Sequence, residues 1–303
     1  MGAMAFLAET SHLRLIIDLC MIGVFGGLYI VPLYALIQVR SDAQHRSRII
    51  AGNNIINAFA MVISVVIVIG LLKAGFTIPQ VLLTAALLNA AVAVYIFTLV
   101  PEFLMRFLVW MLIHTVYRLE KDGIESIPEK GAAVLVCNHV SLVDALIIAT
   151  ACLRPIRFVM DHRIFKTPVL NFIFRTGKAI PIAPAKESPQ IQEQAFDMIE
   201  AALKNGDLVC IFPEGALTSN GEIAEFKPGV RKILDRTAVP VIPLAVRRLW
   251  GSFFSRKASA AMRRWPCGML SKVGLSIGTL VPASAAHPEA LRERVLALRG
   301  DWK

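Results

Sequence analysis

Three long apolar stretches fill the first hundred residues and constrain this chain more than any other feature. They run from about Leu13 to Gln38, Ile49 to Leu72 and Ile78 to Val100. Each is near or above the roughly 20 residues that a helix needs to cross a bilayer. The sequence therefore predicts three transmembrane helices. The composition agrees, because 18% of the residues are charged, against roughly 25% in a typical soluble domain.

The loops between these stretches differ in charge, and this difference predicts their orientation. The first loop carries Arg40, Arg46 and Arg48, whereas the second has only Lys73. Because basic loops stay on the cytoplasmic side, we expect the residues after Val100 to lie in the cytoplasm. The beginning of the chain lacks the basic region and short apolar core of a cleavable signal peptide.

Polar residues interrupt the apolar stretches. Asp18 would either face a bundle interior or lie at the interface beside Arg14. Asn53 and Asn57 share one helix face, which favours helix packing over a binding site.

The pattern changes after residue 100. Residues 101–122 are apolar and aromatic but include several charges, which predicts one connector helix lying at the membrane interface. In residues 123–303, β-rich apolar runs alternate with helical patterns. The pattern predicts an α/β domain in which a mixed, mostly parallel sheet is flanked by helices. The expected strands are Ala132–Cys137, Ile156–Met160, Ala179–Ile182, Leu208–Phe212, Val239–Val246 and Ser271–Leu280, and the expected helices are Leu142–Ala151, Pro168–Phe174, Pro189–Lys204, Val230–Arg236 and Pro288–Leu298.

The motif N-H-V-S-L-V-D directly follows the first of these strands. Parallel α/β sheets bind ligands beyond the carboxyl ends of their strands, so His139 stands where chemistry is expected. Ser141 has the character of a helix N-cap, and Asp144 that of a capping-box acid. Asn138 and His139 have no such structural explanation. A carboxylate that accepts one imidazole N–H makes the other nitrogen a good base, so we predict that Asp144 orients His139.

A second polar motif, F-P-E-G-A-L-T, follows another apolar strand about seventy residues later. By itself F-P-E-G can be a tight turn with a surface glutamate. In a parallel sheet two strand ends can open on one cleft, so the two motifs are expected to meet.

These two motifs, in this order, resemble those of the glycerolipid acyltransferases, and V-P-V-I-P-L-A-V resembles a further block of that family. The resemblance covers about residues 103–281. It implies that His139 deprotonates a glycerol hydroxyl, which attacks an acyl thioester, while Asp144 orients the imidazole. It implies no metal, no cofactor and no covalent enzyme intermediate. The donor would be acyl-CoA or acyl carrier protein. The residues expected to bind the acceptor are Asn138, Ser141, Arg175, Lys178, Phe212, Pro213, Glu214, Gly215 and Thr218.

Two departures from the family pattern affect the expected acceptor. The second block commonly ends in a phosphate-binding arginine, where this chain has Ala183, and the third often continues with an arginine, where it has Leu217. Arg175, Lys178 and Lys186 are the cations near the second block. Loss of two guanidinium groups removes bidentate phosphate recognition. This favours a lysophospholipid with a substituted phosphate over lysophosphatidate.

Residues 1–100 resemble the last three spans of a bacterial major-facilitator lysophospholipid transporter that is fused to a 2-acylglycerophosphoethanolamine acyltransferase. This resemblance implies a multi-pass inner-membrane enzyme, facing the cytoplasm, that re-acylates lysophosphatidylethanolamine. A lysophosphatidate acyltransferase is the alternative within enzymes. A lipid-binding or transporter-derived membrane module without catalysis is the alternative outside them.

Residues 247–266 interleave arginines and a lysine with tryptophan and phenylalanine. This pattern, with a net charge of +10, predicts contact with an anionic membrane surface. The alternatives are that an acidic carrier protein docks there or that the segment is a solvated basic loop. It lacks the signature of a nucleic-acid module.

A second acid–base pair and the cysteines give weaker indications of function. Asp161 and His162 form another acid–base pair, but adjacent residues after a strand rarely face each other. The five cysteines are widely spaced and mostly lie in apolar runs, which predicts buried thiols in a reducing compartment.

Overall fold

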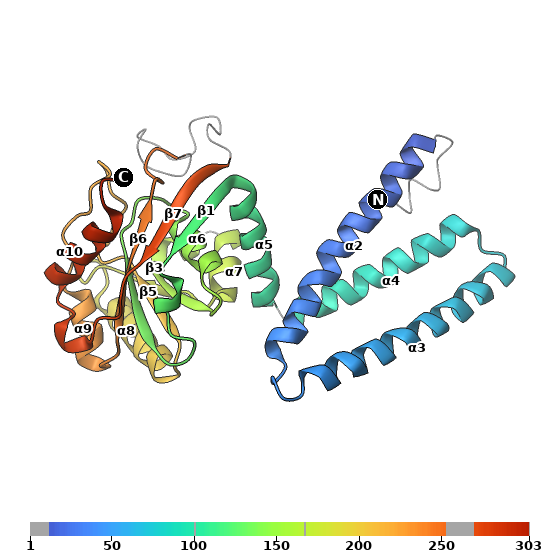
Figure 1. The fold of residues 1–303 in the computed structure, drawn as a ribbon, viewed down its shortest axis with the longest axis horizontal. Helices are drawn as coiled ribbons and strands as arrows, with labels where there is room; N and C mark the ends of the chain where they lie inside the picture. The colour runs from blue at the N-terminus through green and yellow to red at the C-terminus, as the bar shows by residue number, and fades with distance from the viewer. Residues whose placement is uncertain (1–11, 100, 167, 253–269, 303) are drawn as a thin grey trace. The chain divides into compact units, whose positions relative to one another are not determined.

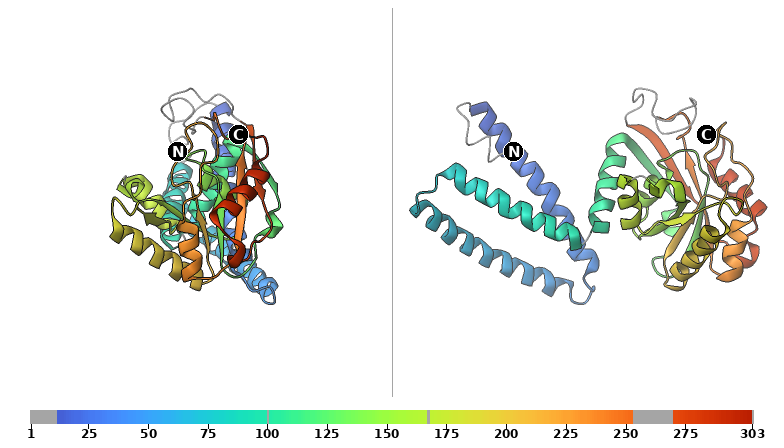
Figure 2. Two further views of the ribbon diagram at one scale, coloured as in Figure 1. Left: turned by 90° about the vertical axis from the view of Figure 1, so that its left-hand side faces the viewer. Right: turned by 180° about the vertical axis from the view of Figure 1, so that it is seen from behind.

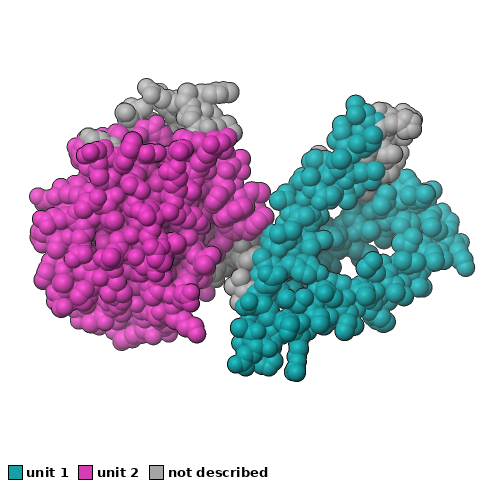
Figure 3. Space-filling model, viewed as in Figure 1, with its two compact units in different colours: residues 1–104 teal, residues 105–303 magenta. Residues whose placement is uncertain are grey.

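The computed structural model describes residues 12–99, 101–166, 168–252 and 270–302. It divides the chain into two compact units, residues 1–104 and 105–303 (Figures 1 and 3). The first contains α2 (His12–Arg40), α3 (Arg46–Lys73) and α4 (Ile78–Leu99). The segments long and apolar enough to cross a membrane are Ile16–Gln38, Arg46–Lys73 and Ile78–Ile96. In the most apolar part of each segment, at most 6% is buried inside the protein. Their apolar side chains therefore face outward, as helices in lipid require.

Polar side chains join two of these helices. The amides of Asn53 and Asn57 both donate hydrogen bonds to the Tyr34 hydroxyl, over 3.2 and 2.8 Å. Hydrogen bonds between apolar helices hold their relative rotation. The expected packing role of the two asparagines is supported.

The second unit contains the end of α5 (Pro101–Val116) and, directly after it, β1 (Tyr117–Asp122). The expectation of one connector helix over residues 101–122 was therefore wrong for its last six residues. These pair in parallel with β7 (Ser271–Ile277) at the edge of the sheet. Their many charges suit a solvent-facing edge strand, and their only partner lies more than 150 residues away. A local pattern could not reveal it.

The second unit is built on a seven-stranded sheet with the order β1-β7-β6-β2-β5-β3-β4. All neighbouring strands are parallel except β6 and β7. The sheet is thus mixed and mostly parallel, as predicted. The remaining strands are β2 (Ala133–Cys137), β3 (Ile156–Asp161), β4 (Ile180–Ile182), β5 (Leu208–Ile211) and β6 (Val241–Arg247).

Helices cover both faces of this sheet (Figures 1 and 2). Buried side chains of α5 and of α6 (Asp144–Ala151) pack on one face, and those of α8 (Pro189–Lys204), α9 (Gly229–Arg236) and α10 (Pro288–Arg299) pack on the other. The other helical segments are α7 (Pro168–Thr176), η1 (Ile124–Ser126), η2 (His162–Lys166) and η3 (Ala283–Ala285).

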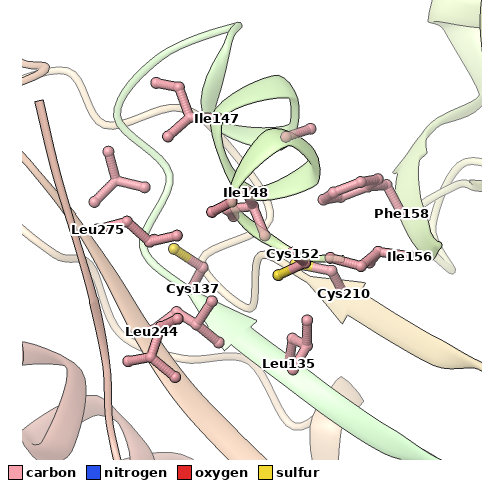
Figure 4. Close-up of a cluster of buried hydrophobic side chains, with 14 of the residues drawn as sticks. Leu135, Cys137, Ile147, Ile148, Cys152, Ile156, Phe158, Cys210, Leu244 and Leu275 are labelled. Carbon is pink, nitrogen blue, oxygen red and sulfur yellow. The ribbon is translucent and has the colours of Figure 1, made fainter. Parts of the chain in front are cut away.

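The core beneath α6 fixes the helix that begins with Asp144. Ile147 and Ile148 are fully buried and lie over β2 and β5, where they join the cluster with Leu135 and Cys210 (Figure 4). Burying a side chain of this size stabilises the fold by about 1.5–3 kcal/mol. The start of α6 is therefore held close to the end of β2.

Three of the cysteines are buried thiols, as expected: Cys137, Cys152 and Cys210. Burial raises the pKa of the Cys152 thiol to about 11, so these thiols are poor nucleophiles near neutral pH. Cys20 on α2 is exposed, and Cys267 lies outside the described residues.

Candidate active site

Two loops meet at the carboxyl edge of the sheet. The histidine loop, residues 138–143, follows β2, and the glutamate loop, residues 212–228, follows β5. Because β2 and β5 are adjacent and parallel, both loops leave the sheet on the same side. The sequence-based expectation that the two motifs meet is confirmed by the hydrogen bonds between them.

The imidazole of His139 is paired with Asp144. Its Nδ1 lies 2.9 Å from Oδ2 of Asp144, whose side chain is fully buried, while the imidazole is 24% exposed. The same Oδ2 accepts hydrogen bonds from the backbone N–H groups of Val140, at 2.8 Å, and Ser141, at 2.9 Å. An oxygen surrounded by donors acts as an acceptor, so Nδ1 carries the hydrogen. The lone pair on Nε2 is then available to take a proton.

The turn before α6 differs in detail from the expected cap. Helix α6 begins at Asp144, and its N-cap is Val143, which makes no side-chain cap. The expected N-cap role of Ser141 was therefore wrong. The buried Ser141 hydroxyl instead accepts from the Val143 N–H at 3.4 Å. The Asp144 carboxylate does reach back to the Ser141 N–H, as a capping-box acid would, although Asp144 is the first residue of α6. The turn is used to bring His139 over Asp144.

The glutamate loop holds both backbone groups of His139. Its N–H donates to Oε1 of Glu214 at 2.7 Å, and its C=O accepts from the N–H of Thr218 at 2.9 Å. Oε2 of Glu214 accepts from the N–H of Ala224 at 2.9 Å. Burial raises the pKa of Glu214, while these two N–H groups lower it in part. One carboxylate oxygen thus holds the histidine backbone, and the other anchors Glu214 within its own loop.

Thr218 has a similar structural task. It is buried, and its hydroxyl donates to the Glu222 carbonyl at 2.8 Å and accepts from the Gly221 N–H at 3.1 Å. The predicted contact of Glu214 and Thr218 with substrate remains untested, since the described hydrogen bonds of both side chains are to the protein.

The rest of the F-P-E-G turn packs around the imidazole. The ring of Phe212 stacks on that of His139, with centroids 4.3 Å apart and an angle of 22° between the planes. Pro213 is buried. Gly215 donates its N–H to the Phe212 carbonyl at 3.0 Å and has φ of 71°, a conformation that favours glycine. The turn therefore limits rotation of the histidine ring.

Asn138 connects the histidine loop to β6. Its side chain is fully buried, with Oδ1 accepting from the Val246 N–H at 2.8 Å and Nδ2 donating to the Val246 carbonyl at 3.1 Å. The amide extends the ladder between β2 and β6 by one residue. Asn138 and Ser141 are both fully buried, and their binding of substrate stays a prediction.

Arg175 and Lys178 stand apart from the two loops. They lie at the end of α7 and in the turn before β4, the edge strand, which β5 and β3 separate from β2. Their role in acceptor binding stays a prediction.

The second acid–base pair is closer than expected. His162 Nδ1 lies 3.4 Å from Asp161 and its Nε2 lies 3.6 Å from Glu187, so the expectation that the pair would not face each other was wrong. Arg163 forms hydrogen bonds with the same Glu187 carboxylate and lowers the pKa of Glu187. These residues form a surface ion cluster.

Other features of the site were outside the reach of sequence patterns. Lys227, whose amino group lies against Gly215, was not singled out, because a lone lysine twelve residues beyond a motif carries no local signal. Within the described ranges, no group of three or more histidine, cysteine, aspartate or glutamate side chains is arranged to hold a metal ion. The basic and aromatic segment 247–266 lies outside the described residues from residue 253 onward.

Sequence comparison shows which known proteins this chain is similar to. Residues 118–247 match the model of the Acyltransferase family. The chain is 25% identical over 190 residues to the 1-acyl-sn-glycerol-3-phosphate acyltransferase of Pseudomonas aeruginosa, covering 62% of this chain and 69% of the relative. It is 26% identical over 135 residues to a chloroplastic enzyme of that name from Arabidopsis thaliana, covering 44% of this chain.

The fold is shared with a solved structure. The crystal structure of the 1-acyl-sn-glycerophosphate acyltransferase from Thermotoga maritima superposes with a TM-score of 0.50 and 23% identity, covering 66% of this chain and 83% of that one. The chain spans 37% of the Arabidopsis thaliana relative, 38% of a Brassica napus relative and 50% of a Mycoplasma pneumoniae relative.

Proposed function

We propose that this protein transfers an acyl group from a thioester to the free hydroxyl of a 1-acylglycerol-3-phosphate and so forms phosphatidate. The observation that carries the proposal is the His139–Asp144 pair. Its imidazole is partly exposed, and the backbone of His139 is held by Glu214 and Thr218. The names of the relatives support the acceptor. They shift our choice from lysophosphatidylethanolamine, which the sequence alone favours, to the phosphomonoester.

The chemistry follows from the pairing. Nε2 of His139 removes the proton of the acceptor hydroxyl while the oxygen attacks the thioester carbon. Asp144 stabilises the imidazolium that forms. The C–S bond breaks, the departing thiolate takes the proton from Nε2, and the imidazole is neutral again. The acyl group moves directly to the acceptor oxygen.

The membrane is the natural source of such an acceptor. A lysolipid lies in the bilayer, and three apolar helices would hold the domain at its surface. The arginine-rich loop after α2 favours a cytoplasmic position for the catalytic domain in a bacterial inner membrane. Acyl-CoA or acyl carrier protein would supply the thioester there.

A lysophospholipid with a substituted phosphate, such as lysophosphatidylethanolamine, is the second candidate. It is favoured by the absence of arginine at two positions, where Ala183 is buried and Leu217 is half-buried. Neither side chain offers a charge to a phosphate.

A lysolipid panel separates these candidates. The purified full-length protein is supplied with labelled acyl-CoA or acyl carrier protein and with lysophosphatidate, lysophosphatidylethanolamine or lysophosphatidylglycerol in mixed micelles. We expect the highest kcat/KM with lysophosphatidate. A preference for lysophosphatidylethanolamine would establish the second candidate. If His139→Ala transfers acyl groups as fast as the wild type, the transfer does not depend on His139. That result would instead favour a membrane module without this catalysis.

A further inference from the structure

Lys227 belongs to the same turn as the F-P-E-G motif, although twelve residues separate it from Gly215. Its backbone N–H donates to the Pro213 carbonyl at 2.9 Å. This bond fixes the start of its side chain beside the motif. The side chain itself is exposed, so it is within reach of a ligand at the carboxyl edge of the sheet.

Gly215 leaves the space that this side chain occupies. A Cβ atom at position 215 would overlap Nζ of Lys227 and come within 3.1 Å of its Cε and 3.2 Å of its Cδ. The lysine therefore lies lengthwise across Gly215. That places the ammonium group one residue from Glu214, whose carboxylate binds the backbone of His139.

The charge of this ammonium group is not neutralised within the part of the chain that the structure describes. Neither an ion pair nor a hydrogen bond of its Nζ is found there. Glu214, the neighbour of Gly215, is buried and its two oxygens accept backbone N–H groups. A positive charge held against Gly215, in the loop that binds the backbone of His139, is suited to an anionic substrate group.

We propose that Lys227 binds the phosphate of the acceptor and sets the preference for a phosphomonoester. This inference rests on the proposed function. A phosphomonoester carries a charge of about −1.5 to −2 at neutral pH because its second pKa is near 6, whereas a phosphodiester carries about half as much. Lysine binds phosphate as a point charge without the bidentate geometry of arginine. Lys227 thereby offsets the missing arginine at Leu217.

The test compares Lys227→Met, which keeps the length of the side chain, with Lys227→Arg, which keeps the charge. The matched control is Lys130→Met, an equal loss of charge at an exposed lysine before β2, at the opposite end of that strand. KM and kcat are measured with lysophosphatidate and with the uncharged acceptor monoacylglycerol. We expect Lys227→Met to raise KM for lysophosphatidate about tenfold or more, with kcat within about threefold and little change for monoacylglycerol. Lys227→Arg and Lys130→Met should stay within about threefold of the wild type.

An unchanged KM for lysophosphatidate in Lys227→Met would overturn the inference, as would an equal rise for monoacylglycerol. A binding experiment tests the phosphate site independently of the proposed acyl transfer. Glycerol 3-phosphate is titrated into each variant and its effect on the melting temperature is followed. If the wild type acylates no lysophosphatidate but is stabilised by glycerol 3-phosphate in a Lys227-dependent way, the proposed acceptor is wrong and the phosphate site stands. If Lys227→Met is stabilised as much as the wild type, the phosphate site is wrong.

Discussion

The histidine loop and the glutamate loop follow neighbouring strands, yet their polar residues have different tasks. The histidine loop presents an imidazole whose other nitrogen is held by a buried carboxylate. The glutamate loop binds the backbone of that histidine from both sides and covers one face of its ring. One loop thus carries the reacting group and the other fixes its geometry. The comparison teaches that the polar residues of a motif can hold a neighbouring motif in position through hydrogen bonds to its backbone.

The largest expected effect is in the histidine loop. His139→Ala should lower the rate of acyl transfer between about 100-fold and 10,000-fold, which is the range that a general base contributes. Its melting temperature should change little, because the imidazole is partly exposed. The control is His287→Ala, an exposed histidine before α10. Equal activity of His139→Ala and the wild type would remove the chemical role of this loop.

Asp144→Asn should have the second largest effect and lower the rate of acyl transfer by about 100-fold. An amide cannot accept hydrogen bonds from the imidazole and two backbone N–H groups and also stabilise the imidazolium. We also expect a lower melting temperature, since these bonds hold the turn before α6. Asp161→Asn is the control, and it tests the second acid–base pair directly. A greater loss of activity in Asp161→Asn than in Asp144→Asn would transfer the chemistry to that pair.

Glu214→Gln should lower kcat about tenfold, because one of the two backbone N–H groups then faces an amide NH2 group. Its KM for lysophosphatidate should change less than its kcat if Glu214 only positions His139. A large rise in KM with kcat preserved would show that Glu214 contacts the acceptor after all.

Melting temperatures of the wild type and Glu214→Gln at different pH values test the direction of the pKa shift of Glu214. Burial raises the pKa of Glu214 above its ordinary value of 4.5, so the folded protein binds this proton more tightly than the unfolded chain. The stability that Glu214 contributes should therefore fall as the pH rises from 4.5 through the raised pKa. The difference in melting temperature between the wild type and Glu214→Gln should shrink over that window. A difference that grows with pH would contradict the assigned direction.

The smallest effect is expected for Phe212→Leu, which removes the ring stacked on His139 but keeps an apolar side chain. Aromatic stacking contributes about 0.5–1.5 kcal/mol, so a loss of activity of about threefold is expected. The measurement is kcat with lysophosphatidate at saturation. A loss as large as that of Asp144→Asn would mean that the ring does more than orient the imidazole.

Most elements of the second unit could be predicted from local patterns. The strands before Asn138 and Phe212 are short apolar runs followed by polar residues, and the helix Pro189–Lys204 has the predicted limits, with Ser188 as its N-cap. The strand Tyr117–Asp122 could not be predicted, because its charged pattern becomes a strand only by pairing with Ser271–Ile277. The interpretation of Ser141 as a cap failed because α6 begins only at Asp144, three residues beyond Ser141.

The sequence by itself determined that the chain has three apolar segments of membrane-spanning length, a mostly parallel sheet, and a histidine–aspartate pair after its first predicted strand. These follow from local hydrophobicity and short spacing. The tertiary structure decided what the other polar residues do. Asn138, Glu214 and Lys227 are separated from their partners by up to 108 residues, and hydrogen bonds across such distances depend on which strands lie side by side. For that reason only the tertiary structure shows that Asn138 and Glu214 hold the histidine loop in place.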